Sequence, residues 1–151
     1  MPATALLCLV IAVADGDTLT ARCGAHTLRV RIAAIDAPES RQRFGPESRQ
    51  QLTRLCWQQR ARITPREQDK YGRTVAQVSC QGQDVASTQV RTGLAWVYTA
   101  YAQNDPQLLP LQQQARAARR GLWAQPRPLP PWSYRQRYGH SNRSSIHSYP
   151  R

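Results

Sequence analysis

The amino-acid sequence predicts an α+β fold that is mainly β, a five-stranded OB-fold barrel with about three packed helices. Five segments have the β-branched or alternating apolar pattern of strands, and a helical segment follows the third of them. Strands in this order, with a helix inserted after the third, imply a small closed barrel. The 151 residues, 40% of them hydrophobic, suit one domain with a single core.

The five strands are predicted at residues 6–14, 18–23, 26–35, 61–64 and 74–80. Asp15-Gly16 lies between the first two, and we expect it to form a two-residue type I′ turn, because that turn needs positive φ angles. In the third strand apolar residues alternate with arginines, so that Arg31 lies on the face opposite Val30. Pro38 cannot donate to a strand ladder, and the chain is therefore expected to leave the sheet there.

Three helices are predicted at residues 46–59, 84–91 and 106–120. Pro46-Glu47 suits the first turn of the first helix, since proline needs no amide hydrogen there and an acid is favoured at the positive end of the helix dipole. Gly93 and Gly121 are expected to end the other two helices. From residue 125 on, proline, serine and arginine dominate. We therefore predict a domain at 5–124 and a disordered tail at 125–151.

The chain has four cysteines. If the first turn has two residues, Cys8 faces Cys23 across the hairpin, at a separation that a disulfide spans with little adjustment. Cys56 and Cys80 then remain as a second possible pair. Such pairing favours a secreted or periplasmic protein. The alternative is four reduced cysteines in the core.

The charge is strongly positive. The formal net charge is +12, with 21 lysines and arginines against nine acids, and Lys70 is the single lysine. Such a surplus favours a polyanionic partner. Nucleic acid fits better than a membrane, because no stretch approaches the roughly 20 apolar residues of a spanning helix.

Four acids lie where two predicted strands end: Asp15 and Asp17 at the first turn, and Asp36 and Glu39 after the third strand. A cluster of oxygen ligands suits a hard divalent cation, Ca²⁺ above all. Arg31 among these acids suggests a phosphate group. The plainer interpretation is that the first two acids form the turn and the other two are solvated in a loop.

A second feature is the segment Asp69-Lys70-Tyr71-Gly72-Arg73. Together with five other segments, in order and with compatible spacing, it makes the chain resemble the staphylococcal nuclease (thermonuclease) family from about residue 8 to 124. The other segments are Asp15-Gly16-Asp17-Thr18, Arg31 with Ile35-Asp36-Ala37-Pro38-Glu39, Phe44-Gly45-Pro46-Glu47, Val90 to Ala95, and Gly121-Leu122-Trp123.

The resemblance implies a role for each of ten positions. Asp17, Asp36 and the Ala37 carbonyl would hold Ca²⁺, with Asp15 behind them. Arg31 and Arg73 would clamp the phosphoryl oxygens, and Glu39 would orient or deprotonate the attacking water. Lys70 and Tyr71 would contact the flanking phosphate, and Tyr98 or Tyr101 would stack on the nucleotide. We expect Arg31, Arg73 and Glu39 to line a wet rim of the barrel and not its core.

The implied activity is that of a monomeric Ca²⁺-dependent nuclease that cleaves phosphodiester bonds in DNA and RNA with little sequence choice. Its products would carry a 3′-phosphate. The alternative is an OB-fold module that binds nucleic acid without catalysis, and the retained acids and arginines favour the enzyme. A structural or protein-binding Ca²⁺ module would leave Arg31 and Arg73 without a role. The basic loop at 40–44 is shorter than the lysine-rich loop of the family's best-known members.

Overall fold

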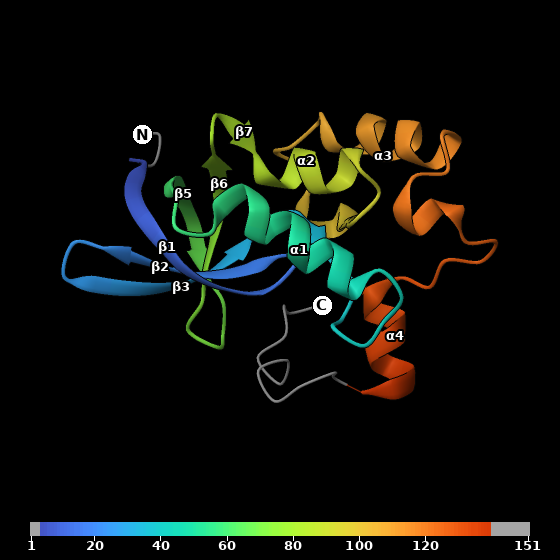
Figure 1. The fold of residues 1–151 in the computed structure, drawn as a ribbon, viewed down its shortest axis with the longest axis horizontal. Coiled ribbons are helices and arrows are strands. Elements are labelled where there is room, and N and C mark those ends of the chain that lie inside the picture. The colour runs from blue at the N-terminus through green and yellow to red at the C-terminus, as the bar shows by residue number, and fades with distance from the viewer. Residues whose placement is uncertain (1–3, 140–151) are drawn as a thin grey trace.

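The computed structural model describes residues 4–139, and its centre is a closed barrel of five strands (Figure 1). The barrel strands are β1 (Leu6–Asp15), β2 (Thr18–Cys23), β3 (His26–Ile32), β5 (Arg60–Gln68) and β6 (Thr74–Cys80). Neighbours in the order β3-β2-β1-β5-β6 are antiparallel, and parallel pairing of β3 with β6 closes the ring. The predicted five-stranded barrel is confirmed.

Short strands and helices complete the described part of the chain. β7 (Gln83–Asp84) extends the sheet beside β6, and β4 (Ile35–Asp36) pairs with β8 (Trp96–Val97) outside the barrel. The helices are α1 (Gly45–Cys56), α2 (Val85–Arg91), α3 (Leu108–Ala117) and α4 (Pro131–Tyr138), with 3-10 turns η1 (Thr99–Tyr101) and η2 (Gly121–Ala124). Within residues 4–139, no helix has both the length and the apolar character needed to cross a bilayer.

The β1–β2 turn differs from its prediction. Asp15 pairs with Thr18, so the turn residues are Gly16 and Asp17, and Gly16 is not among the residues with positive φ. Two register shifts in β1 then restore the pairing of Leu9 with Arg22. The type I′ turn at Asp15-Gly16 is therefore wrong, because β-bulges inside the hairpin compensate for a differently placed turn.

Both predicted disulfides are present. Cys8 is bonded to Cys23 and Cys56 to Cys80. The restored register brings the first pair together across the hairpin. The second bond joins the last residue of α1 to the last residue of β6.

The predicted third strand is broken in two. β3 ends at Ile32, and Ala34 has a left-handed φ of 72°. The backbone changes partner here, since the Ala33 amide donates to Ala76 of β6, whereas the Ala34 carbonyl accepts from the Tyr98 amide. The kink directs Asp36 out of the barrel to lie opposite Trp96.

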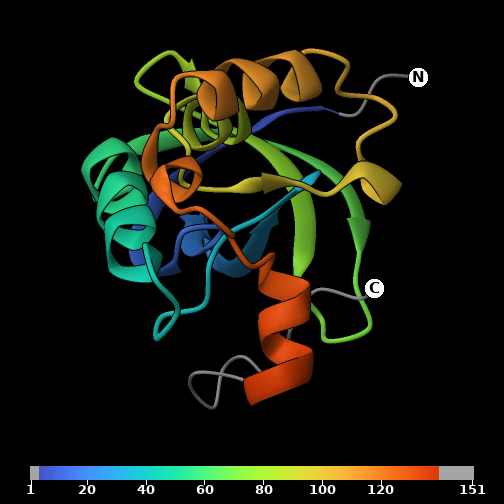
Figure 2. The ribbon, with the colours of Figure 1, turned by 90° about the vertical axis from the view of Figure 1, so that its right-hand side faces the viewer.

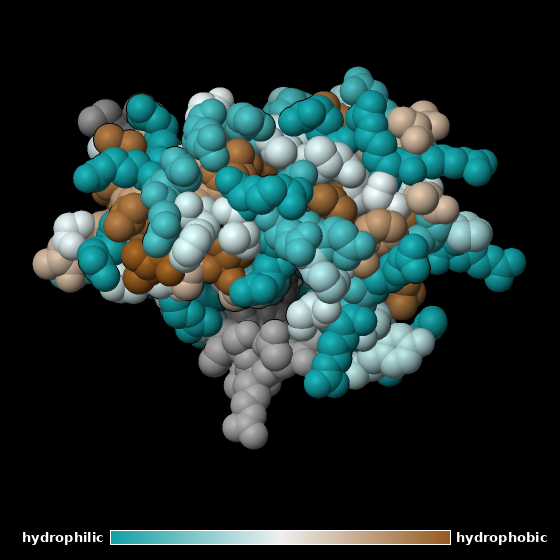
Figure 3. All heavy atoms as spheres, in the orientation of Figure 1, coloured by the Kyte–Doolittle hydropathy of each residue, from teal (hydrophilic) through white to brown (hydrophobic). Residues whose placement is uncertain are grey.

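The core fills the barrel and the space between it and α1, α2 and α3, whereas the face of the molecule shown in Figure 3 is largely hydrophilic. Its fully buried members include Val10, Leu19, Ile32, Ile63 and Val78 from the strands. The helices add a second layer that includes Leu52, Val90 and Leu108. This core fixes the strand ends on which the acidic residues lie.

The C-terminal segment is more ordered than its composition predicts. We expected no regular structure after residue 125, but Pro131–Tyr138 forms α4, which begins at a proline that needs no amide hydrogen bond in that position. Figures 1 and 2 show α4 below the barrel, beside the loop that leads into α1. Residues 140–151 of the predicted tail lie outside the described residues.

Candidate active site

The predicted acids and arginines gather at one end of the barrel. This end is formed by the β1–β2 turn, the break between β3 and β4, and the β5–β6 turn. The expected wet rim is wrong, because the side chains are buried: Arg31 is 1% exposed and Arg73 is 4% exposed. Asp17, Asp36 and Glu39 are buried as well. The C-terminal segment covers Asp36 and Glu39, as the contacts of Arg135 below show.

Arg31 joins the two strand ends. Its Nη1 lies 3.4 Å from Asp17 Oδ2 and its Nη2 lies 3.6 Å from Asp36 Oδ1. Nη1 also donates to the carbonyl of Ile32 at 2.8 Å. Asp17 Oδ2 in turn accepts from the amide of Ala37 at 2.7 Å. The first turn and the segment after β4 are therefore held together through one carboxylate.

The two acids of the turn have different electrostatic environments. Burial alone would raise the pKa of Asp17, but the charge of Arg31 and the hydrogen bond from Ala37 bring it below its ordinary value. Burial and the neighbouring Asp17 raise the pKa of Asp15 well above its ordinary value. Asp15 Oδ1 accepts from the amide of Asp17 at 3.1 Å, so this acid supports the turn from behind.

The turn is also anchored to α1 and α2, through residues that the sequence analysis missed. Gln89 Nε2 donates to the carbonyl of Gly16 at 2.7 Å and to the carbonyl of Ser48 at 3.0 Å. A Cβ atom on Gly16 would overlap Ser48 and Ala37, so the close approach requires glycine. The signal that would have found Gln89 is a polar residue on the otherwise apolar face of a helix.

The main chain of Glu39 is fixed by the loop that follows it. Its amide donates to Gln42 Oε1 at 3.1 Å, and its carbonyl accepts from the Gln42 amide at 2.9 Å. Gln42 Nε2 also donates to the carbonyl of Leu129 at 2.6 Å. The loop at 40–44 therefore positions Glu39 and holds the segment that precedes α4.

Arg73 enters the site from the β5–β6 turn. Its Nε lies 2.7 Å from Asp69 Oδ2, while Asp69 Oδ1 accepts from the amides of Tyr71 and Arg73 at 2.9 Å each. Arg73 Nη2 is buried and has no hydrogen-bond acceptor among the described residues. Burial and the charge of Arg31 lower the pKa of Arg73. A buried guanidinium with an unused donor is suited to bind an anion.

The residues predicted to contact substrate lie around this cluster. Lys70 is exposed, with Nζ 5.3 Å from the centre of the Tyr71 ring, and the Arg73 guanidinium lies 5.9 Å from the same ring. Tyr98 is only 8% exposed. Its ring stacks on Trp132 at 5.5 Å and meets Tyr101 edge-on at 4.9 Å. One face of the Tyr98 ring is thus covered by another aromatic ring.

Arg135 of α4 completes the cluster, and no local signal in the sequence pointed to it. Its Nη2 lies 2.7 Å from Asp36 Oδ2, and its Nη1 lies 3.2 Å from Asp36 Oδ1 and 2.9 Å from Glu39 Oε1. Burial alone would lower the pKa of Arg135, but the two carboxylates raise it. Burial raises the pKa of Asp36 and of Glu39 by more than Arg135 lowers them.

Comparison with known proteins identifies the family to which this chain is similar. The family model described as staphylococcal nuclease homologue matches residues 29–125, well over half of the chain. The chain belongs to the staphylococcal nuclease family. A protein named micrococcal nuclease from Shigella flexneri is 37% identical over 137 residues, which covers 84% of this chain and 79% of the relative.

Two further relatives carry the name uncharacterized endonuclease. The one from Haemophilus influenzae is 40% identical over 130 residues, covering 85% of this chain and 72% of the relative. The one from Escherichia coli is 40% identical over 129 residues, covering 85% and 84%. The resemblance expected from the sequence motifs is confirmed, and it extends over most of each chain.

The ligands expected in a member of this family can be tested against the side chains present. Asp17, Asp36 and the Ala37 carbonyl offer carboxylate and carbonyl oxygens without thiol or imidazole, which suits a hard divalent cation. In chemical type the donor set fits. Within residues 4–139, however, no three His, Cys, Asp or Glu side chains converge as a metal cluster. Asp36 and Glu39 are turned to Arg135 instead.

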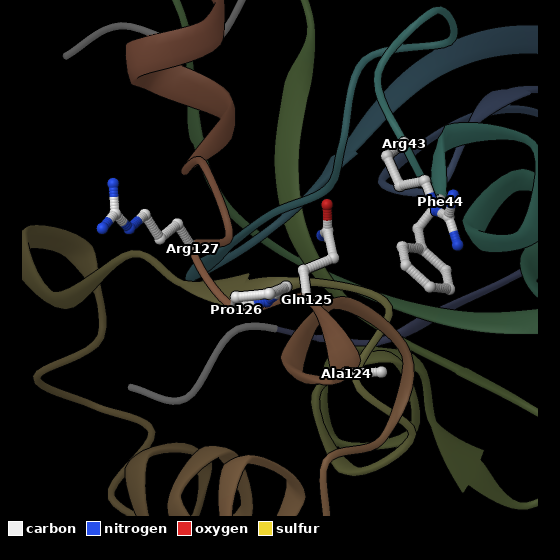
Figure 4. Close-up of a pocket in the computed structure, with 6 residues that line it drawn as sticks. All are labelled: Arg43, Phe44, Ala124, Gln125, Pro126 and Arg127. Atoms are coloured by element: carbon white, nitrogen blue, oxygen red, sulfur yellow. The ribbon is translucent and has the colours of Figure 1, made fainter.

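Two hollows lie beside the acidic cluster. The hollow in Figure 4 has a volume of about 510 Å³ and is lined by Arg43 and Phe44 on one side and by residues 124–127 on the other. A smaller hollow of about 270 Å³ lies between Gln42 and α4 residues Tyr134 and Tyr138. Both hollows lie between the C-terminal segment and the loop at 40–44.

Proposed function

We propose that this chain is a nuclease that hydrolyses phosphodiester bonds in DNA and RNA with Ca²⁺ as its metal ion. The observation that carries the proposal is that Arg31 is buried between Asp17 and Asp36, while Arg73 is close enough to feel the charges of Arg31 and Asp17 and has an Nη2 that is unused among the described residues. The names of the relatives, micrococcal nuclease and endonuclease, support a hydrolase. The net charge of +12 supports a polyanionic substrate.

The acids and arginines of the site have separate proposed roles. Asp17, Asp36 and the Ala37 carbonyl hold the metal ion, which when bound would neutralise charge on the phosphate and the attacking oxygen. Arg31 and Arg73 bind phosphoryl oxygens and stabilise the charge that grows in the transition state. Glu39, with a raised pKa, orients the attacking water and accepts its proton.

The substrate contacts are assigned to the periphery of this cluster. Lys70 and Tyr71, adjacent at the β5–β6 turn, contact the flanking phosphate, and Tyr98 stacks on a base. Contacts to backbone and base faces carry little sequence information, so broad specificity follows. We propose 3′-phosphorylated products, action as a monomer, and an extracellular or periplasmic location, the last supported by the two disulfides.

The test is cleavage of plasmid DNA and of RNA by purified protein, with Ca²⁺ or with excess chelator. Arg73→Lys should lower turnover by orders of magnitude with a much smaller change in substrate affinity, because lysine keeps the charge but loses the planar fork. Arg31→Lys should behave alike. The matched control is Arg29→Lys, an exposed arginine two residues earlier in β3.

Two results would contradict the proposal. Full cleavage in excess chelator would exclude the metal assignment. Binding of DNA without cleavage in Ca²⁺ would favour the alternative of a non-catalytic OB-fold module.

A further inference from the structure

The C-terminal segment contacts the proposed active site at three points. The carbonyl of Leu129 accepts from Gln42, the residue that fixes Glu39. Trp132 stacks on Tyr98 at 5.5 Å. Arg135 reaches the carboxylates of Asp36 and Glu39. All three contacts are long-range, and the arginine lies 99 and 96 residues from its two partners in sequence.

The contact of Arg135 with Asp36 uses both oxygens of the carboxylate, at 3.2 and 2.7 Å. A divalent cation held by Asp36 needs one of these oxygens and brings two positive charges next to the guanidinium. The two cations would repel each other and compete for the same lone pairs. Arg135 and the metal ion are therefore alternative occupants of this carboxylate.

The contact of Trp132 with Tyr98 involves the residue that is proposed to stack on a nucleotide base. The two rings are nearly parallel, with an angle of 23° between their planes. This is the arrangement that a nucleotide base would adopt on Tyr98. With α4 in place, one helix occupies both the position of a cation and the position of a base.

Two side chains anchor α4: Arg135 through its ion pairs, and Trp132 through its contacts with the rings of Tyr98 and Trp96, each at 5.5 Å. Pro131 and Arg135 are its buried residues, and its other arginine, Arg137, is exposed. The hollows of about 510 and 270 Å³ interrupt the packing between the C-terminal segment and the loop at 40–44. By contrast, the segment before residue 125 is firmly anchored, since the Leu122 amide donates to the Gly93 carbonyl at 2.8 Å and Trp123 is buried. The chain can therefore release α4 without disturbing the domain.

We propose that α4 is an autoinhibitory helix and that Arg135 is a built-in cation that competes with the metal ion for Asp36 and Glu39. In the metal-free protein Arg135 neutralises the two carboxylates and Trp132 covers Tyr98. A metal ion together with a nucleic acid displaces both residues at once. The inference rests on the proposed function, because it takes Asp36 as a metal ligand and Tyr98 as the stacking residue.

Metal affinity tests the proposal without any cleavage assay. Ca²⁺ is titrated into the full metal-free chain by calorimetry, in the absence of nucleic acid. Arg135→Ala should bind Ca²⁺ at least roughly fivefold more tightly than the unmodified protein, the lower end of the usual coupling between linked binding events. Arg135→Lys should fall between the two, because it keeps the charge but not the fork. Arg137→Ala, on the exposed side of the same helix, is the matched control and should bind as the parent does.

A second variant and a second readout cover the case in which Arg135→Ala does not fold. Trp132→Ala loosens α4 without touching the carboxylates and should also tighten Ca²⁺ binding. In the unmodified protein, Ca²⁺ should accelerate tryptic cleavage after Arg135, as mapped by mass spectrometry. Protection of this bond by Ca²⁺ would overturn the proposal.

The outcomes separate this inference from the proposed function. If Arg135→Ala folds and binds Ca²⁺ no more tightly, while the parent cleaves DNA in Ca²⁺, then α4 is a structural element and the nuclease assignment stands. If the parent neither binds Ca²⁺ nor cleaves, the proposed function fails and the inference fails with it. Weaker substrate binding by Arg135→Ala with unchanged Ca²⁺ affinity would make Arg135 a third phosphate-binding arginine and would also refute the inference.

Discussion

The hydrogen bonds of Gln89 connect the stability of the fold to the geometry of the site, and a single substitution tests both. In Gln89→Leu the carbonyls of Gly16 and Ser48 lose donors that lie 2.7 and 3.0 Å away, and Gln51 loses an acceptor at 2.8 Å. The volume of the side chain is nearly unchanged. The change in stability therefore measures the loss of buried hydrogen bonds and not the creation of a cavity.

The magnitude follows from the number of buried groups left without a partner. The Gly16 carbonyl loses its buried donor, whereas the Ser48 carbonyl lies within α1 and keeps a helical amide donor, so the free energy of unfolding should fall by about 1–3 kcal/mol. For a chain of this size the melting temperature should drop by about 2–12 °C. Because Asp17 follows Gly16 directly, a loosened turn also misplaces a proposed metal ligand. Cleavage should fall by about 10²-fold well below the melting temperature, as expected for a displacement of about 1 Å.

Urea unfolding and cleavage kinetics at 25 °C give the two readouts. The control is Gln113→Leu, an exposed glutamine on α3, which should change stability by less than about 0.5 kcal/mol. A loss below that value for Gln89→Leu would show that the turn is held by other contacts. Loss of stability with normal cleavage would show that the position of Asp17 does not depend on α2.

Three further predictions concern the acids and the disulfides. Glu39→Gln should lower turnover by about 10²-fold or more with the fold intact, whereas Glu47→Gln on α1 should not; equal rates would remove Glu39 from the chemistry. Reduction of the two disulfides should cost about 3 kcal/mol for each bond in the chain-entropy model, and an unchanged melting temperature in reductant would contradict this. Burial of Asp69 is outweighed by its hydrogen bonds from Arg73, so its pKa is lowered and its stabilising contribution is present above a pH of about 4 and lost as the pH falls below it. Asp69→Asn should therefore be less stable than the parent at pH 7, and melting curves should converge toward pH 3; a constant difference across this range would refute the assignment.

The sequence predicts those parts of the molecule that depend on local pattern. Strand alternation, turn residues and helix termini predict the barrel, the helices on its outside and the strand ends where Asp17 and Asp36 lie, whereas Arg73 was placed at the site by the resemblance to the family. The first disulfide was predicted correctly from a turn that was placed wrongly, because two bulges in β1 cancel the error in register before Cys8 is reached. Bulges of this kind leave no mark in the pattern of apolar residues.

The position of Arg135 could not be predicted from local sequence pattern. Its partners are almost a hundred residues away, and its own surroundings consist of prolines and polar residues that predict no packed structure. A buried ion pair is selected by the three-dimensional arrangement of charges, which periodicity does not describe. The same holds for Gln42, whose role depends on two segments that are distant in the chain.

The two disulfides have a common location with a consequence for how this protein can change. Cys8 lies near the start of β1, whose other end is Asp15, and Cys80 ends β6, which begins beside Arg73. Both disulfides therefore lie at the end of the barrel opposite the acids. Each doubling of the length of a loop costs only about 0.6 kcal/mol, and each disulfide stabilises the fold by several times that amount. Insertions beyond residue 125, or in the loop at 40–44 where they keep Gln42 on Glu39, should thus leave the fold intact, so that new substrate preferences can arise at one end of the barrel while the other end preserves the fold.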